Sequence, residues 1–227
     1  MIEYIILVIF VIVAIIEVFG EFKENSKIIY VTKPFLMPLL IMYYIFGVIE
    51  TSSIVRVDWF IVIALIGGMG GDIFLMLKDE DKWFLPGMGS FLINQIFYII
   101  SFFLSITSYA AFNVWALFLI VPSLLILFFT VPRFIKNTGS MKIPVLVYMA
   151  AILLMHISAL LRIADLRLQG LPFIMIFIGS LSYVFSDASI ATNKWAGEFK
   201  NARVIILTTY ILAQFYIVLG ALLTSML

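Results

Sequence analysis

Apolar runs about as long as a membrane-spanning helix recur along nearly the whole chain, and no other feature constrains the fold as strongly. A helix needs about 20 mostly apolar residues to cross a bilayer. Eight such runs can be placed: Ile2–Phe19, Pro34–Ile49, Trp59–Leu77, Gly87–Ser108, Asn113–Thr130, Ile143–Leu161, Leu171–Ala191 and Val204–Leu227. The connections are short. The sequence therefore predicts an all-α integral membrane protein, a bundle of eight transmembrane helices in a single domain over residues 1–227.

The composition supports this class. Hydrophobic residues make up 64% of the chain and charged residues 12%, whereas a soluble domain is about half apolar and about a quarter charged. A net charge of +1 gives no indication of a nucleic-acid partner. The absence of cysteine excludes disulfides and thiol chemistry. The first run carries Glu3 and lacks a basic leader and a cleavage site of small residues, so we interpret it as a retained helix.

The boundary between the fourth and fifth runs is the least distinct. No charged residue occurs between Trp83 and Pro132, and that stretch is too long for one membrane-spanning helix. We expect a break at Ser108–Asn113, where small and polar residues interrupt the apolar sequence.

Basic residues are distributed unequally between the two sides of the predicted bundle. The connections after runs one, three, five and seven share one side, and with their flanks they carry Lys23, Lys27, Lys33, Lys78, Lys82, Arg133, Lys136, Lys142, Lys194, Lys200 and Arg203. The other side carries only Arg56, Arg162 and Arg167. Because cytoplasmic loops are enriched in lysine and arginine, we expect both termini to lie outside the cytoplasm, with the cell membrane as the location.

Two aspartates lie well inside apolar runs, Asp187 in the seventh and Asp72 in the third. An ionised carboxylate in hydrocarbon is energetically costly, so such a residue normally faces a cavity or a polar partner. On a helix, Asp187 shares one polar stripe with Gly179, Ser182, Tyr183 and Ser186. We expect Asp72 and Asp187 to form one buried functional site. The alternative is that each is a structural acid hydrogen-bonded to a neighbouring helix.

Other polar residues fall at a similar depth, within a few helical turns of the cytoplasmic end. They are Asn94, Gln95, Tyr98, Tyr148, Tyr210 and Gln214, with Lys33 at the start of the second run. Their convergence predicts a polar layer that opens towards the inner leaflet. Each of them alone is also consistent with a hydrogen bond between helices or, for Lys33, with an end residue that reaches the interface. His156 is the only histidine, so we expect no metal site.

The two halves of the chain share a pattern. Gly71-Asp72 corresponds to Ser186-Asp187, and the glutamine and tyrosine pairs of the fourth and eighth runs also correspond, although the spacings do not match perfectly. The pattern is consistent with two four-helix halves of the same orientation.

The segment Gly179–Asn193 resembles the signature of the YhhN-like lysoplasmalogenase family of multispanning membrane proteins. Further matches follow in order along the chain: Thr32-Lys33-Pro34, Gly71-Asp72, Gly87, Phe91, Tyr98, Tyr148, Met155, Tyr210 and Gln214. The resemblance implies hydrolysis of the vinyl ether bond of a lysophospholipid substrate, a lysoplasmalogen, without a cofactor. The products are a fatty aldehyde and a glycerophospho-base. Gln95 stands where the family usually has histidine, so either the histidine is dispensable or the chemistry of this member is altered.

Vinyl ether hydrolysis fits paired carboxyl groups. The reaction proceeds by protonation of the outer alkene carbon and gives an oxocarbenium ion, so it needs an acid and a stabilising anion, the roles that paired carboxylates share in glycosidases. We expect Asp72 and Asp187 to be the catalytic pair, in either assignment of roles. The supporting residues expected from the resemblance and the polar layer are Lys33 for the lipid phosphate, and Gln95, Tyr98, Tyr148, Tyr183, Ser186, Asn193, Tyr210 and Gln214 for water and substrate.

Two other classes remain open. A carrier or binding protein for a small amphiphile or ion would use the aspartates as cation or proton sites. A structural membrane protein would tolerate replacement of both aspartates without any change in lipid turnover.

Overall fold

The computed structural model describes the backbone of all 227 residues and every side chain except that of Glu80. The described chain is 86% helical. Its α-helices are α1 Ile2–Phe22, α2 Ser26–Thr51, α3 Trp59–Met76, α4 Glu80–Ser105, α5 Val121–Phe134, α6 Lys142–Leu161, α7 Leu171–Trp195 and α8 Ala202–Ser225. Short 3-10 helices connect them: η1 Ile54–Arg56, η2 Val114–Ile120, η3 Ile135–Asn137, η4 Gly139–Met141, η5 Arg162–Ala164 and η6 Leu166–Leu168. The predicted all-α membrane fold is confirmed.

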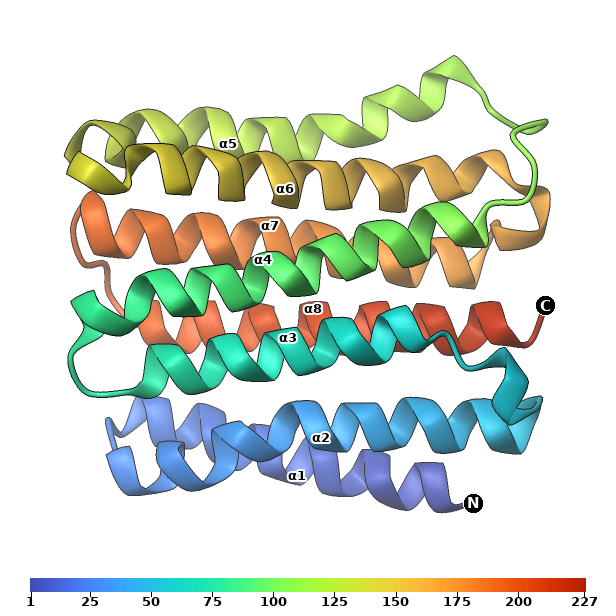
Figure 1. Cartoon of the computed structure of the whole chain (residues 1–227), viewed down its shortest axis with the longest axis horizontal. Coiled ribbons are helices and arrows are strands. Elements are labelled where there is room, and N and C mark those ends of the chain that lie inside the picture. The colour runs from blue at the N-terminus through green and yellow to red at the C-terminus, as the bar shows by residue number, and fades with distance from the viewer.

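The helices run side by side along one axis (Figure 1). Three sequential pairs, α1 with α2, α3 with α4, and α7 with α8, form close antiparallel contacts. Helix α6 packs on α4 and α7, while α5 packs on α7 at the edge of the bundle. Both chain termini lie at one end, which we call the terminal end. The connections after α1, α3, α5 and α7 lie at the opposite end, which we call the basic end.

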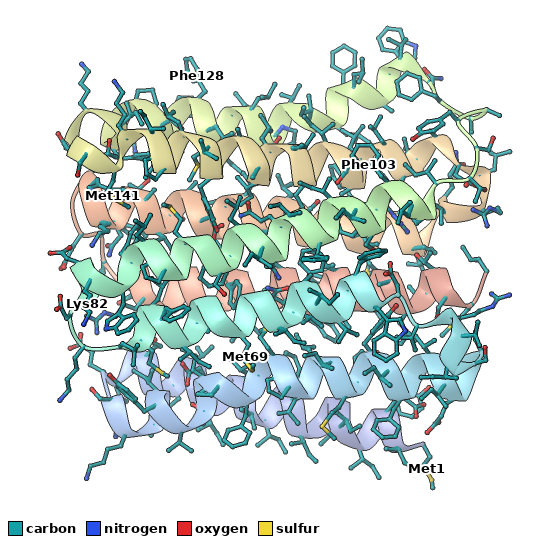
Figure 2. All side chains as sticks on the ribbon, viewed as in Figure 1. Met1, Met69, Lys82, Phe103, Phe128 and Met141 are labelled. Carbon is teal, nitrogen blue, oxygen red and sulfur yellow. The ribbon has the colours of Figure 1, made fainter. Side chains whose placement is uncertain are left out.

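The outer surface of the bundle is apolar, as a protein in contact with lipid requires. Ile5 and Ile15 on α1 and Phe128 on α5 are exposed, and Figure 2 shows Phe128 pointing away from the bundle. Eight helical segments of the described chain are long and apolar enough to cross a membrane. The protein is therefore a multi-pass membrane protein. That the basic end faces the cytoplasm stays a prediction from the charge distribution.

Several helices begin earlier than their apolar runs. Helix α2 starts at Ser26 and not at Pro34, because the side chain of Asn25 accepts hydrogen bonds from the backbone at its N-terminus, 3.1 Å from Lys27 N. Helix α4 starts at Glu80 and not at Gly87. The prolines inside these helices are tolerated, as is common in membrane helices. An apolar run marks the part of a helix that lies in hydrocarbon, whereas the helix itself continues to its cap.

The predicted break between the fourth and fifth runs is confirmed: α4 ends at Ser105 and the next helical residue is Val114. The predicted fifth span, Asn113–Thr130, begins within one residue of the observed helical span Val114–Asn137 but ends too early. Residues Val114–Ile120 form a 3-10 helix, and α5 begins at Val121 with proline in its first turn. Because proline lacks the backbone N–H of a helix interior and fits the first turn, the regular helix starts there.

The helix contacts agree in part with a duplicated bundle. Helices α3 and α4 pair as α7 and α8 do, and α2 packs on α8 as α6 packs on α4. The outer helices differ, because α1 packs on α2 whereas α5 packs on α7. The inner helices of the two halves therefore pack in the same pattern, whereas the outer helices α1 and α5 pack differently.

Asp165 links the loops of the terminal end through hydrogen bonds. Its buried carboxylate accepts hydrogen bonds from Arg167 Nη2 at 2.9 Å and from Thr107 N at 2.8 Å. The hydrogen bonds from the Arg167 side chain, followed by those from Thr107, hold the pKa of the Asp165 carboxyl well below its usual range.

A group with a lowered folded pKa contributes stability that is fully present above its unfolded pKa, about 4 for aspartate, and that is lost as the pH falls through the folded pKa. We therefore expect Asp165→Asn to lower the unfolding midpoint in detergent at pH 7, and the difference from wild type to shrink in acid. Thermal unfolding of both proteins at neutral pH and near pH 3 measures this. A difference that stays constant with pH would contradict it.

Candidate active site

A cavity of about 550 Å³ extends from the basic end into the bundle between α2, α3, α7 and α8. Lys78 and Asp79 of the α3–α4 connection line its mouth, and Arg203 lines it at the start of α8. Asp72 and Asp187 both line its interior, although each side chain is almost completely buried in the protein, with 4% of its surface exposed. The structure thus brings the two intramembrane acids to one space that is open towards the basic end.

Asp72 is held by α8. Its Oδ2 accepts a hydrogen bond from the hydroxyl of Tyr210 at 3.0 Å, and Gln214 Nε2 donates to that hydroxyl at 3.2 Å. The approach depends on Gly68, one turn before Asp72, because a Cβ there would lie 3.0 Å from the Tyr210 hydroxyl and 3.1 Å from Gln214 Nε2. The glycine-rich sequence of α3 therefore admits the polar side chains of α8 to the carboxylate.

Asp187 is held by α4 and α6. Its Oδ2 accepts hydrogen bonds from the hydroxyl of Tyr148 on α6 and, at 3.3 Å, from Nε2 of Gln95 on α4. Gln95 is fully buried and its Oε1 has no hydrogen-bond partner among the described residues. Each aspartate of one half of the chain is thus contacted by a helix of the other half. This reciprocal arrangement fixes both carboxylates at the centre of the bundle.

A buried polar layer separates the aspartates from the terminal end. The hydroxyl of Tyr98 donates to Gln214 Oε1 at 2.5 Å, which links α4 to α8. Tyr183 is fully buried with its ring edge-on to Tyr210, 5.7 Å between ring centroids. None of Tyr98, Tyr183 and Gln214 lines the cavity. Their position indicates that they support Tyr210 and close the floor of the cavity.

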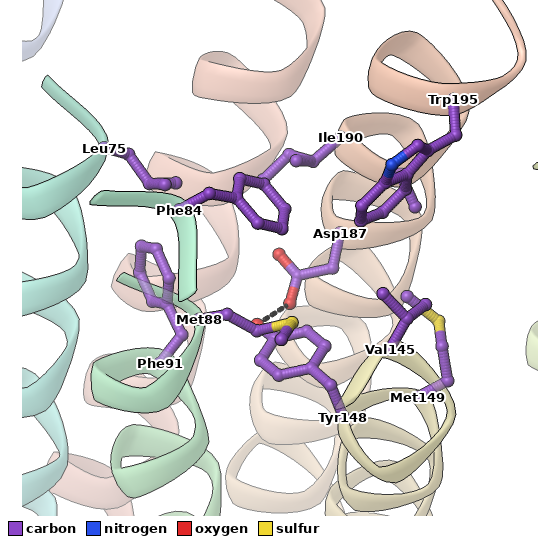
Figure 3. A pocket seen from close by; sticks show the side chains of 11 residues that line it. Leu75, Phe84, Met88, Phe91, Val145, Tyr148, Met149, Asp187, Ile190 and Trp195 are labelled. Atoms are coloured by element: carbon purple, nitrogen blue, oxygen red, sulfur yellow. Dashed lines mark hydrogen bonds between the residues drawn. The ribbon is translucent and has the colours of Figure 1, made fainter. Parts of the chain in front are cut away.

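A second, narrow space of about 30 Å³ adjoins Asp187 between α4, α6 and α7 (Figure 3). Its walls are mainly apolar, with Phe84 and Met88 of α4 on one side of Asp187 and Val145 and Met149 of α6 on the other. We call this space the apolar crevice. Asp187 lines both the crevice and the larger cavity, together with Leu75, Phe91 and Ile190. The carboxylate therefore stands where a polar space meets an apolar one.

Basic side chains line the polar space towards its mouth. Lys33 of α2 lines the cavity, and its Nζ lies 3.6 Å from Oε1 of Glu21 on α1. Ser186 also lines the cavity, while its hydroxyl donates to the backbone oxygen of Ile206 at 3.0 Å. Within the described part of the chain, no three His, Cys, Asp or Glu side chains cluster as a metal site requires.

A further expected site residue, Asn193, also lies away from the cavity walls. It sits in the last turn of α7, where its Oδ1 accepts a hydrogen bond from Phe199 N at 3.3 Å. It therefore stabilises the α7–α8 connection. Glu21, Tyr30 and Arg203 also line the cavity, which the sequence did not predict. The spacing of Glu17 and Glu21, four residues apart on the first helix, is the signal that could have indicated an acidic face next to Lys33.

These features define a multi-pass helical membrane protein with two buried carboxyl groups on a cavity that is reached from one membrane face. Residues 28–221 match the sequence profile of the YhhN family, and the chain belongs to this family, which is the lysoplasmalogenase family. Searches among curated proteins and among solved structures found no significant match.

Proposed function

We propose that the protein hydrolyses the vinyl ether bond of lysoplasmalogens and releases a fatty aldehyde and a glycerophospho-base. The observation that carries this proposal is the position of Asp187 at the junction of the polar cavity and the apolar crevice, with Asp72 on the same cavity. A lysoplasmalogen has its reactive bond at the same kind of junction, between a polar head group and a single apolar chain. Membership in the lysoplasmalogenase family supports the same reaction.

In this proposal the polar part of the substrate lies in the cavity and its chain begins in the apolar crevice. The phosphate of the head group lies in the cavity, where Arg203 and Lys33, the latter next to Glu21, provide positive charge towards the basic end. The first carbons of the alkenyl chain, next to the vinyl ether, enter the crevice between α4, α6 and α7, whose volume of about 30 Å³ is too small for the whole chain. The vinyl ether then lies at the carboxylates. A lipid with one chain matches this arrangement of a polar and an apolar space at Asp187.

The proposed reaction uses both carboxyl groups. One, in its protonated form, donates its proton to the outer carbon of the double bond, and positive charge develops on the carbon bonded to the ether oxygen. The other, ionised, stabilises this charge and accepts a proton from the water that attacks that carbon. The resulting hemiacetal breaks down: its bond to the glycerol oxygen breaks, this oxygen takes up a proton, and the remaining hydroxyl loses its proton to become the aldehyde.

The neighbouring side chains position these groups. Tyr148 and Gln95 donate to the same oxygen of Asp187, which leaves the other oxygen for the substrate. Tyr210 likewise donates a hydrogen bond to Oδ2 of Asp72 and holds that carboxyl group in place. Because hydrogen bonds in a low-dielectric interior fix geometry strongly, these donors keep both carboxylates aligned on the cavity.

The test is the release of aldehyde by purified protein in detergent from a lysoplasmenyl lipid. The matched substrate control is the saturated lyso-alkyl ether, which has the same head group and chain but no double bond to protonate. We expect aldehyde from the first lipid and no cleavage of the second. Failure of folded wild-type protein to release aldehyde would contradict the proposal.

A carrier for a small amphiphile is the second candidate, because the terminal end holds a further polar cavity lined by arginines. A carrier would move a labelled lysolipid between the two leaflets of a vesicle, in dependence on an ion gradient, without forming product. The same protein preparation in vesicles decides between the two functions.

Gln95 offers a finer test. Gln95→Leu removes a hydrogen-bond donor to Asp187 and is expected to lower aldehyde release about tenfold, the effect of one such bond. Gln95→His keeps a donor and adds a group that exchanges protons near neutral pH, so we expect it to retain or raise the activity. Steady-state rates of the two variants measure this. Equal rates for Gln95→Leu and wild type would show that the contact does not matter to the reaction.

A further inference from the structure

The cavity of the candidate active site has an acidic residue to which the proposed reaction gives no role. Among the described residues, the acids that line it are Glu21, Asp72, Asp79 and Asp187. Asp72 and Asp187 carry out the proposed reaction, and Asp79 caps α4, where its Oδ1 accepts a hydrogen bond from Lys82 N at 3.4 Å. Glu21 remains. It lies in the last turn of α1, at the basic end of the bundle.

The carboxylate of Glu21 is buried but loosely paired. Its side chain is 9% exposed, and Lys33 Nζ lies 3.6 Å from its Oε1. That separation is longer than an N–H···O hydrogen bond, which is about 2.7 to 3.2 Å. Among the described residues, Lys33 is its one ion-pair partner. An ionised carboxylate can accept several hydrogen bonds, so Glu21 keeps free acceptor sites towards the cavity that it lines.

A second glutamate adds to the acidity of this part of α1. Glu17 lies one turn before Glu21 and is fully buried. Its Oε2 accepts a hydrogen bond from the hydroxyl of Thr32, the residue before Lys33, and its Oε1 has no partner among the described residues. Two carboxyl groups of α1 thus face α2 where a single ammonium group, that of Lys33, pairs with one of them. The arrangement favours a further cation beside Glu21.

The position of Glu21 matches the order of groups in the proposed substrate. Asp187 lies about two turns inside the end of α7, whereas Glu21 lies in the last turn of α1, and both helices end at the basic end. In a lysoplasmalogen, glycerol and phosphate stand between the vinyl ether and the amine of the head group. With the vinyl ether at the aspartates and the phosphate towards Lys33 and Arg203, the amine lies nearest the mouth of the cavity, at the depth of Glu21.

We propose that Glu21 binds the amine of the head group, so that the preferred substrate carries ethanolamine and not choline; this inference rests on the proposed function. The primary ammonium of ethanolamine has N–H donors, like the side chain of lysine, and a carboxylate accepts them in charge-assisted hydrogen bonds. The quaternary ammonium of choline has no N–H group and is typically bound on the faces of aromatic rings.

The aromatic residues of the cavity do not form such a site around Glu21. They are Tyr30, Phe91 and Tyr210. Phe91 packs edge-on against Tyr210, with 5.7 Å between ring centroids, and Tyr210 holds Asp72. Tyr30, near the start of α2, contributes one ring, and its hydroxyl donates to Met76 O at 2.7 Å. A carboxylate with a single aromatic neighbour selects a primary ammonium over a quaternary one.

Competition binding with saturated lyso-alkyl ether lipids tests the site without any cleavage. A radiolabelled lyso-alkyl phosphoethanolamine is bound to immobilised protein in detergent and displaced by unlabelled lipids with either head group. The ethanolamine lipid is expected to displace it at about tenfold lower concentration, the effect of one charge-assisted hydrogen bond. In Glu21→Gln the two concentrations are expected to agree within about twofold. Glu24→Gln, at an exposed glutamate of the α1–α2 connection, is the matched control and keeps the preference.

Equal binding of both lipids by wild-type protein, binding of neither, or a preference that persists in Glu21→Gln overturns the inference. So does a loss of affinity in Glu21→Gln that is equal for both lipids, because a structural role predicts that result. The kcat/KM values for lysoplasmenyl lipids with the two head groups separate this inference from the proposed function. Aldehyde release without a head-group preference contradicts the role of Glu21 alone, whereas a preference in binding that depends on Glu21, without aldehyde release, supports the amine site and contradicts the hydrolase.

Discussion

Asp187→Asn is expected to lower the rate of aldehyde release at least about a hundredfold, and Asp72→Asn is expected to do the same, because general acid and base groups commonly contribute about a hundredfold to ten-thousandfold. Asparagine has the shape of aspartate and still offers an oxygen to Tyr148 or Tyr210, so the hydrogen bonds that hold the site are largely kept. What it lacks is a proton to exchange and a negative charge to stabilise the oxocarbenium ion.

The matched control for these variants is Asp81→Asn. Asp81 lies at the same end of the bundle but is highly exposed, with a surface ion pair to Lys194 at 3.2 Å. Such pairs contribute little to stability, so the variant is expected to keep the activity of wild type. Rates are compared at saturating lipid with samples that elute as a single species in size-exclusion chromatography. A folded Asp187→Asn or Asp72→Asn protein that keeps half of the wild-type rate would remove that residue from the proposed reaction.

Gly179→Val is expected to prevent α7 and α8 from packing and to destabilise the protein by about 3 kcal/mol or more, at the upper end for an overpacked core. A Cβ at Gly179 would lie 2.9 Å from the backbone atoms Ala213 O and Ile217 N, which cannot move aside as a flexible side chain would. Since α7 carries Asp187 and α8 carries Tyr210, the loss of this contact also disrupts the site. We expect little folded protein and no aldehyde release.

Gly89→Val is the control for this substitution. It introduces the same side chain into another membrane helix, at an exposed glycine with no atom within 4 Å of the added Cβ. Its unfolding midpoint and yield of single-species protein are expected to stay close to those of wild type. If the two valine variants were equally stable, the idea that Gly179 is needed for the close packing of α7 and α8 would be contradicted.

The helices were predictable from the sequence because each needs a long apolar segment. The residues at which the helices begin were less predictable. Pro34 and Gly87 interrupt the apolar pattern, yet α2 and α4 continue through polar residues to Ser26 and Glu80. A helix end depends on local capping, as at Asn25, and a capped polar turn leaves no mark in the hydrophobicity pattern. A hydrophobic run indicates which part of a helix lies in the bilayer, not the residues at which the helix begins and ends.

The meeting of Asp72 and Asp187 was also predictable, because an acid in hydrocarbon requires a polar environment and the charge distribution placed both at one depth. The hydrogen-bond partners of each aspartate were not predictable. Whether Tyr148 or Tyr98 reaches Asp187 depends on the rotation of each helix and on its neighbours. Asn193 belongs to the same polar segment as Asp187, but it lies beyond the cavity, in the last turn of α7, where its Oδ1 accepts a hydrogen bond from the backbone N–H of Phe199 in the following connection.

The apolar crevice left no recognisable signal in the sequence. Phe84 and Met88 on α4 and Val145 and Met149 on α6 are ordinary residues of a membrane helix, and aromatic residues make up 16% of the chain. Only the packing of α4, α6 and α7 around Asp187 distinguishes them from residues that face lipid. The polar half of the candidate site could thus be predicted, whereas the apolar half required the structure.

The most direct measurement of the central claim is hydrolysis of a lysoplasmenyl lipid in water enriched in oxygen-18, with mass analysis of the glycerophospho-base. Protonation of the alkene followed by attack of water on the adjacent carbon leaves the original ether oxygen in the glycerol product. We predict that purified protein releases aldehyde while the glycerol hydroxyl remains unlabelled. Oxygen-18 in that hydroxyl, or no aldehyde from folded protein, would contradict vinyl ether hydrolysis by the paired aspartates.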